Sequence, residues 1–157
     1  MQTMISPLPA VTAVTPLEVD SARRDAALPD LIRATTIPQV YRAAARLLVR
    51  NGHHQGDLLP DPFDRRLTTL HVNRPLSIVA AIRCVAAGNP HVSSPFSELA
   101  VRVLAHRLLV DGEGPFGDSR LALATHVDSW GDAEGRTVES CVAVLEAAAD
   151  ASKAVAL

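Results

Sequence analysis

The sequence predicts a mainly α-helical protein, a compact bundle of four to five helices around one buried central helix. Several segments repeat apolar residues at helical spacing, with Ser, Thr or Pro where a helix would begin and Gly where it would end. The chain has 157 residues, of which 48% are hydrophobic. A chain of this length buries enough surface to fold without a disulfide or a metal.

Residues 1–28 are predicted to form a flexible N-terminal tail. They contain several Pro, Thr and Ser residues and no sustained apolar period. Residues 29–157 are then expected to form a single helical domain. Because such a tail makes few contacts with a core, we expect it to add little to the stability of the protein.

The first helix is predicted between Thr35 or Thr36, either of which suits the N-cap, and Gly52, which suits the end. Pro38 falls in its first turn, where proline is tolerated. The residues that follow, 57–72, do not have the pattern of a helix. Leu67–Val72 is rich in strand-forming residues and could pair with Asp57–Leu59, which predicts at most a minor β-hairpin.

The second helix is predicted from Pro75 to Ala87, with Gly88 and Pro90 after it. It is apolar nearly all round, and Arg83 is its only charged residue. Helices of this kind are usually the most buried ones in a bundle, so we expect this helix at the centre.

Three further helices are predicted in the C-terminal half from their caps and apolar periods. They are a helix that begins at Ser93 or Ser94 and ends at Gly112 and Gly114, a short helix from Asp118 or Ser119 to about Val127, and a last helix that starts at Thr137. The segment around Trp130 between the last two is expected to be a loop.

The charge balance argues against nucleic acid as a partner. Lys plus Arg is 15 and Asp plus Glu is 17, which gives a net charge of −2, whereas nonspecific nucleic-acid binding needs a basic surface. No apolar stretch approaches the ~20 residues that span a bilayer, and the N-terminus is a poor signal peptide because its first basic residue is Arg23. We therefore expect a cytoplasmic protein with no membrane partner.

The C-terminal segment Ser129–Thr137 reads Ser-Trp-Gly-Asp-Ala-Glu-Gly-Arg-Thr. It resembles the Trp-Asn-Asp-x-x-Gly-Arg-Thr signature of an uncharacterised domain-of-unknown-function family of actinobacteria and their phages. Asn51–Gly56 and Ser77–Arg83 resemble other parts of that family, so that the likeness covers roughly residues 38–150. Two positions depart from the family pattern, Gly131 in place of Asn and His53 in place of Trp. The resemblance implies no activity.

Candidate site residues cluster in polar segments at the ends of the predicted helices. The ligand-binding candidates are His53, Gln55, Asp57, Trp130, Asp132 and Arg136. The candidates for general acid or base catalysis are His54, His71, His126 and Asp128, because imidazoles titrate near neutral pH. The expected site lies where residues 53–57 meet His71 and residues 126–132. The competing interpretation is that Gln55 and Asp132 only tie two loops together.

Other chemistries lack their sequence signals. No two histidines have the i, i+4 spacing of a helical metal site, so neither a metal nor a cofactor is expected. Ser77 lacks a Gly-x-Ser-x-Gly motif, and Cys84 is interpreted as a buried, inert thiol.

Two functions remain open. The favoured one is a small helical module that binds a protein or a small molecule in a regulatory or accessory role, with a homodimer as one possible state. The alternative is a small cofactor-independent enzyme of specialised metabolism that uses histidine acid–base chemistry. A deep pocket that holds two or more of His54, His71 and His126 together with Asp128 would favour the enzyme, and a shallow pocket with an exposed apolar face would favour the binding module.

Overall fold

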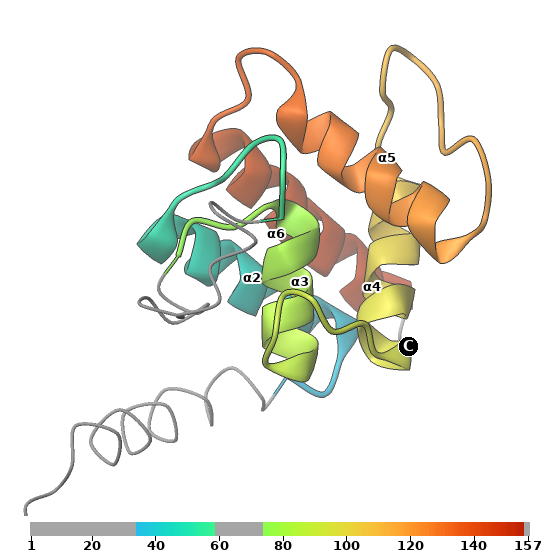
Figure 1. Cartoon of the computed structure of the whole chain (residues 1–157). Helices are drawn as coiled ribbons and strands as arrows, with labels where there is room; N and C mark the ends of the chain where they lie inside the picture. Colours follow the sequence, from blue (N-terminus) through green and yellow to red (C-terminus); the bar gives the residue numbers. More distant parts are fainter. Residues whose placement is uncertain (1–33, 59–73, 156–157) are drawn as a thin grey trace, which may run out of the picture.

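The computed structural model describes residues 34–58 and 74–155, and in these residues it is a bundle of helices (Figure 1). The predicted mainly α-helical class is confirmed. The described helices are α2 (Ile37–Asn51), α3 (Ile78–Ala87), α4 (Pro95–Ala105), α5 (Arg120–Asp132) and α6 (Val138–Val155). The predicted hairpin depends on residues 59–73, and His71 is one of them, so both lie outside the described residues.

Helix α2 begins and ends where its caps predict. The Thr36 side chain accepts a hydrogen bond from the backbone N–H of Gln39, and the N–H of Gly52 donates to the carbonyl of Leu48 at 2.8 Å. Gly52 has φ of 95°, a conformation that side chains with a Cβ rarely adopt. This turn sends the chain directly into the segment that carries His53 and His54.

Helix α3 is the central element, as predicted, because it packs against α2, α4 and α5. It begins at Ile78 rather than at Pro75. The residues before it are held in extended form, since the N–H of Leu76 donates to the carbonyl of Gly52 and the carbonyl of Leu76 accepts from the N–H of His54. Ser77 then serves as the N-cap.

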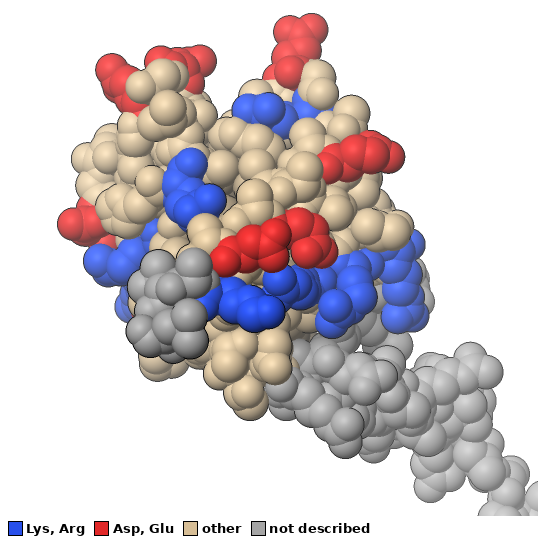
Figure 2. Space-filling view, turned by 180° about the vertical axis from the view of Figure 1, so that it is seen from behind, with Lys and Arg blue, Asp and Glu red and all other residues tan. Residues whose placement is uncertain are grey.

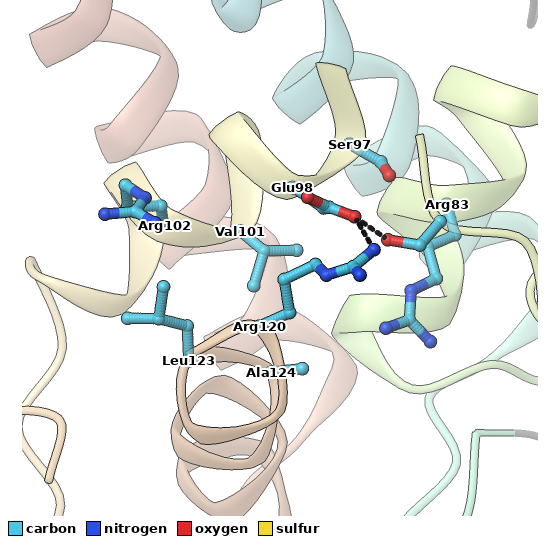
Figure 3. A pocket seen from close by; sticks show the side chains of 9 residues that line it. Arg83, Ser97, Glu98, Val101, Arg102, Arg120, Leu123 and Ala124 are labelled. Atoms are coloured by element: carbon cyan, nitrogen blue, oxygen red, sulfur yellow. Dashed lines mark hydrogen bonds and ion pairs between the residues drawn. The ribbon is translucent and has the colours of Figure 1, made fainter. Parts of the chain in front are cut away.

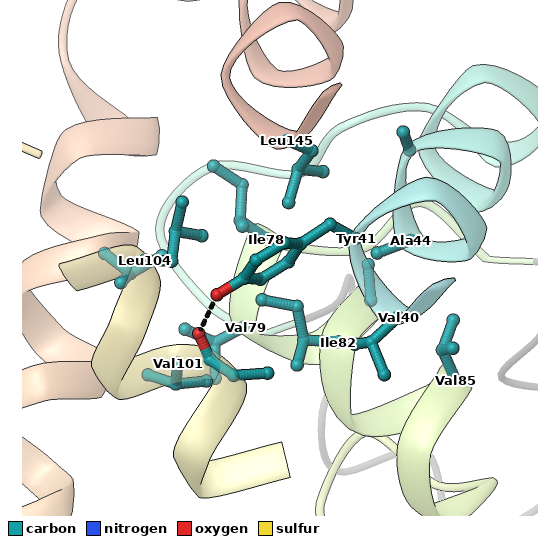
Figure 4. Packing of buried hydrophobic residues seen from close by; sticks show 14 of the residues in the cluster. Val40, Tyr41, Ala44, Ile78, Val79, Ile82, Val85, Val101, Leu104 and Leu145 are labelled. Atoms are coloured by element: carbon teal, nitrogen blue, oxygen red, sulfur yellow. Dashed lines mark hydrogen bonds between the residues drawn. The ribbon is translucent and has the colours of Figure 1, made fainter. Parts of the chain in front are cut away.

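The core is built around α3 from side chains of the neighbouring helices (Figure 4). The Tyr41 ring of α2 is fully buried there, and its hydroxyl donates to the carbonyl of Ala100 at 2.6 Å. Burial of this ring raises the pKa of the Tyr41 hydroxyl, which therefore stays neutral. The labelled core residues come from four helices and are Val40, Tyr41, Ala44, Ile78, Val79, Ile82, Val85, Val101, Leu104 and Leu145.

The substitution Ala81→Leu is expected to lower the free energy of unfolding by about 1–3 kcal/mol, because it adds three carbon atoms to a filled core. Ala81 has no exposed surface. The same change at Ala147, an exposed position of α6, should alter stability by less than about 0.5 kcal/mol. Urea unfolding of both variants measures the difference in their free energies of unfolding. Equal effects would show that the core around α3 can accommodate a larger side chain.

Helix α4 is shorter than predicted and ends at Ala105, well before Gly112. The chain turns back at Asp111 and Gly112, which both have positive φ, and Val110 and Glu113 exchange two backbone hydrogen bonds across that turn. Two positive φ values in an Asp-Gly pair are typical of a tight type I′ turn. Residues in this turn cannot also continue α4, so the helix ends before them.

Helix α5 is longer than predicted. It runs to Asp132 instead of about Val127, so Trp130, Gly131 and Asp132 lie on a helix and the expected loop is confined to the residues after them. Helix α6 begins directly after Thr137, as predicted, where the side chains of Thr137 and Ser140 cap each other's backbone N–H groups.

Helix α6 packs along α2 over most of its length, and ion pairs support this packing at the surface. Arg42 lies 2.7 Å from Asp150 and 3.7 Å from Glu146. On the face drawn in Figure 2, a row of basic side chains borders a group of acidic ones, so the charge of that face is mixed. No helix in the described residues is both long and apolar enough to cross a membrane.

Candidate functional site

The segment after α2 meets the C-terminal end of α5, as the sequence predicts. The Gln55 side-chain amide donates to the carbonyls of Gly131 at 3.0 Å and Ala133 at 3.3 Å. The N–H of Gly56 donates to the Asp132 carboxylate at 2.9 Å. These bonds join two chain segments that are far apart in the sequence. They agree with the competing interpretation, in which Gln55 and Asp132 hold two segments together.

His53 is half-buried in the same junction and packs against the backbone of α5. A Cβ built on Gly131 would lie 3.1 Å from His53 Nε2 and 3.4 Å from Ile78 Cδ1. Burial lowers the pKa of His53, an effect that the nearby Asp132 carboxylate opposes. The two positions that depart from the family pattern are therefore in contact, and the small Gly131 makes room for the ring.

Asp128 lies one helical turn before Asp132 and faces the N-terminus of α3. Its two carboxylate oxygens accept hydrogen bonds from the Ser77 hydroxyl and from the N–H of Val79, both at 3.2 Å. Burial raises the pKa of the Asp128 carboxyl to about 7, although both hydrogen bonds oppose the rise. Its geometry is that of a helix cap supplied from a distant helix.

The candidate histidines have different surroundings. His126 is buried, and its Nε2 lies 2.8 Å from the carbonyl of Leu108, which places the ring at the connection between α4 and α5. His54 is half-buried beside Leu76, to which its backbone N–H donates. Asp57 is exposed. His126 and His54 thus contact different parts of the protein, His126 at Leu108 and His54 at Leu76.

Trp130 and Arg136 form a stacked pair at the end of α5. The Arg136 guanidinium carbon lies 3.7 Å from the centre of the Trp130 ring, and Arg136 Nε donates to the Trp130 carbonyl at 2.9 Å. Trp130 is only 8% exposed. The pair closes the C-terminus of α5, because the guanidinium covers the ring and satisfies a helix-end carbonyl.

Within the described residues, no group of three or more His, Cys, Asp or Glu side chains is placed to hold a metal ion. The two thiols, Cys84 and Cys141, are buried and unpaired with each other. Burial raises the pKa of Cys84 to about 12 and that of Cys141 to about 11, so both remain thiols at neutral pH.

A cavity of about 360 Å³ lies elsewhere, between the first turn of α2, the second half of α4 and the end of α6. We call it the α2–α4–α6 cavity. The sequence does not indicate this cavity, because its walls come from three distant segments that carry no motif. Its lining residues are Thr36, Ile37, Pro38, Val103, Arg107, Ala151 and Ser152.

The model of DUF6197, a family of unknown function, matches residues 32–151. No curated protein and no solved structure matches the chain. The actinobacterial or phage origin suggested by the C-terminal signature stays a prediction.

Proposed function

We propose that this chain, which belongs to the DUF6197 family of unknown function, is a small module that binds an amphipathic carboxylic acid in the α2–α4–α6 cavity. The observation that carries the proposal is the size and lining of that cavity. In this proposal the module serves a regulatory or accessory role in the cytoplasm.

The volume of the cavity favours a small molecule. Ligand sites usually measure about 300–1,000 Å³ and are mostly apolar, with a few polar groups that orient the ligand. The cavity of about 360 Å³ falls in that range. Ile37, Pro38, Val103 and Ala151 supply an apolar wall, and burial of a hydrocarbon against it is the main source of affinity.

The charge at the cavity favours an acidic headgroup. Arg107 lines it from the residues after α4 and is exposed, so its guanidinium can reach a ligand without first being taken out of water. The nearby Tyr41 hydroxyl does not neutralise Arg107, because burial raises the pKa of that hydroxyl and keeps it uncharged. A carboxylate is one of the groups that a guanidinium binds with two parallel hydrogen bonds.

The proposal is tested with the full chain and two probes. Anilinonaphthalene sulfonate combines an apolar body with an anion, and decanoate, the carboxylic acid of the proposed class, should displace it. Ala151→Phe fills the cavity and should weaken binding of both probes at least tenfold. The matched control is Ala147→Phe, the same change at an exposed position of the same helix, which should leave binding unchanged.

A charge variant separates the two parts of the ligand. Arg107→Gln should weaken decanoate binding more than it weakens binding of decanol, which has the same chain without the charge. The proposal is overturned if decanoate does not bind, or if Ala151→Phe and Ala147→Phe have equal effects. Near-ultraviolet circular dichroism of each variant shows whether the tertiary packing is intact.

A second candidate function, a cofactor-independent enzyme, is favoured by one observation. His53 packs against α5 and Asp128 belongs to α5, and burial lowers the pKa of His53 and raises that of Asp128. Such paired shifts are common among acid–base catalysts. The Asp128 oxygens, however, already accept two hydrogen bonds from α3, which favours a structural role for this residue.

A further inference from the structure

We propose that a second, arginine-lined cavity between α3, α4 and α5 binds the dianionic phosphate group of a small molecule or free inorganic phosphate (Figure 3). It is independent of the α2–α4–α6 cavity, because its walls come from other helices and from the opposite side of α4. The lining residues are Arg83, Ser93, Ser97, Glu98, Val101, Arg102, Arg120, Leu123 and Ala124.

The charged side chains of this cavity come from three helices. Arg83 extends from α3, Glu98 and Arg102 belong to α4, and Arg120 is the first residue of α5. In Figure 3 the guanidinium groups of Arg83 and Arg120 lie on the same side of the Glu98 carboxylate. The cavity has a volume of about 30 Å³, which suits a single small group rather than a whole ligand.

The charge of the lining is positive. The lining holds three guanidinium groups and one carboxylate, that of Glu98, which stays ionised because hydrogen bonds from Arg120 and Ser93 lower its pKa. Asp118, outside the lining, lies 4.0 Å from Arg102 and offsets part of that charge. Arg83 also lies near Asp128, and because the pKa of that carboxyl is raised to about 7, its opposing negative charge is reduced at acidic pH. Because positive charge remains, the lining favours an added anion.

The contacts of Glu98 show which donors of this cavity hold a carboxylate oxygen. One of its oxygens, Oε1, accepts from Arg120 at 2.7 Å and from the Ser93 hydroxyl at 2.8 Å. A phosphate oxygen at the mouth of the cavity would find donors of the same kind, and the planar guanidinium of Arg83 adds a further pair of N–H groups. A dianion matches two arginines better than a second carboxylate does.

Binding is measured by calorimetry on the full chain, with sodium chloride used to keep ionic strength constant. Inorganic phosphate and phenyl phosphate are the two probes. Tighter binding of phenyl phosphate would identify a phosphorylated small molecule as the source of the group, and equal or tighter binding of inorganic phosphate would identify the free ion. Chloride alone should give no saturable heat.

Opposite effects of two variants make the test specific. Arg83→Gln should weaken phosphate binding at least fivefold, whereas Glu98→Gln, which removes the competing negative charge, should strengthen it. Arg46→Gln, on the exposed side of α2, is the matched control and should change nothing. The proposal is overturned if the wild-type chain gives no saturable binding of either probe, or if Arg83→Gln and Arg46→Gln behave alike. Melting curves confirm that each variant is folded.

Discussion

Asp128→Ala is expected to lower the free energy of unfolding by about 2–4 kcal/mol at pH 6. The substitution leaves the Ser77 hydroxyl and the Val79 N–H without their acceptor, and both groups lie at the buried start of the central helix. A buried donor that loses its partner costs about 1–3 kcal/mol. Urea unfolding at fixed pH measures the loss.

Asp128→Asn is the matched control for this result. Its amide oxygen can still accept from Val79, and its side chain has nearly the same volume as that of Asp128, so we expect it to keep most of the stability. If Asp128→Ala were as stable as the wild-type chain, the capping role would be wrong. The raised pKa of the carboxyl would then favour acid–base chemistry instead.

The pH dependence has a definite sign. The Asp128 carboxyl has a pKa of about 7 in the folded chain, against an ordinary value of 3.8. Between about pH 4 and pH 7 the folded state therefore binds more protons at this group than the unfolded state does. Its contribution to the free energy of unfolding falls as the pH rises through that window and is constant above it.

The difference in stability between the wild-type chain and Asp128→Asn isolates this dependence. Both chains keep His53, whose lowered pKa acts in the opposite sense just below its ordinary value of 6.5, so its effect largely cancels in the difference. The wild-type chain should lose stability relative to Asp128→Asn as the pH rises from 4 to 7. A flat difference would show that the carboxyl is already ionised at pH 4 in the folded chain.

The sequence was most informative where local chemistry decides the structure. The caps of α2, Thr36 and Gly52, act through neighbours within one turn, so their residue types are enough to predict both ends of the helix. The burial of α3 was equally predictable, because a helix with one charged residue has no face for water.

The end of α5 was not predictable because distant residues determine it. The segment between Val127 and Thr137 contains two glycines and three acidic residues, which locally favour a turn. In the fold, Gln55 donates to the carbonyls of Gly131 and Ala133, and Gly56 donates to Asp132. These contacts satisfy groups at the helix end that would otherwise need water, so the helix continues through Asp132.

The candidate site was predicted in part for a similar reason. The sequence predicted that His53, Gln55 and Asp132 lie close together. In the structure Gln55 binds the backbone on either side of Asp132, and His53 lies near the Asp132 carboxylate. The sequence indicated neither cavity, because the lining residues of each come from distant segments with no shared motif, as Arg83, Arg102 and Arg120 do. Only the packing of α3, α4 and α5 gathers them.

Trp130→Ala is expected to have the largest effect of all, a loss of about 3–5 kcal/mol in the free energy of unfolding. The Trp130 ring is 8% exposed and belongs to the core cluster, so its removal leaves a cavity at the end of α5. A loss of this size would identify the residue as part of the structure, whereas a ligand-binding tryptophan on the surface would cost little stability.

The Arg136 stack adds a smaller, separable part of this stability. Arg136→Ala removes a cation–π contact worth about 0.5–1 kcal/mol at a surface site, together with a hydrogen bond to the Trp130 carbonyl. In a double-mutant cycle, Arg136→Ala should cost less in the Trp130→Ala background than in the wild-type chain, because the ring that it covers is gone. Equal costs in both backgrounds would mean that the guanidinium acts only through the carbonyl, and the stacked geometry would then contribute nothing to the closure of α5.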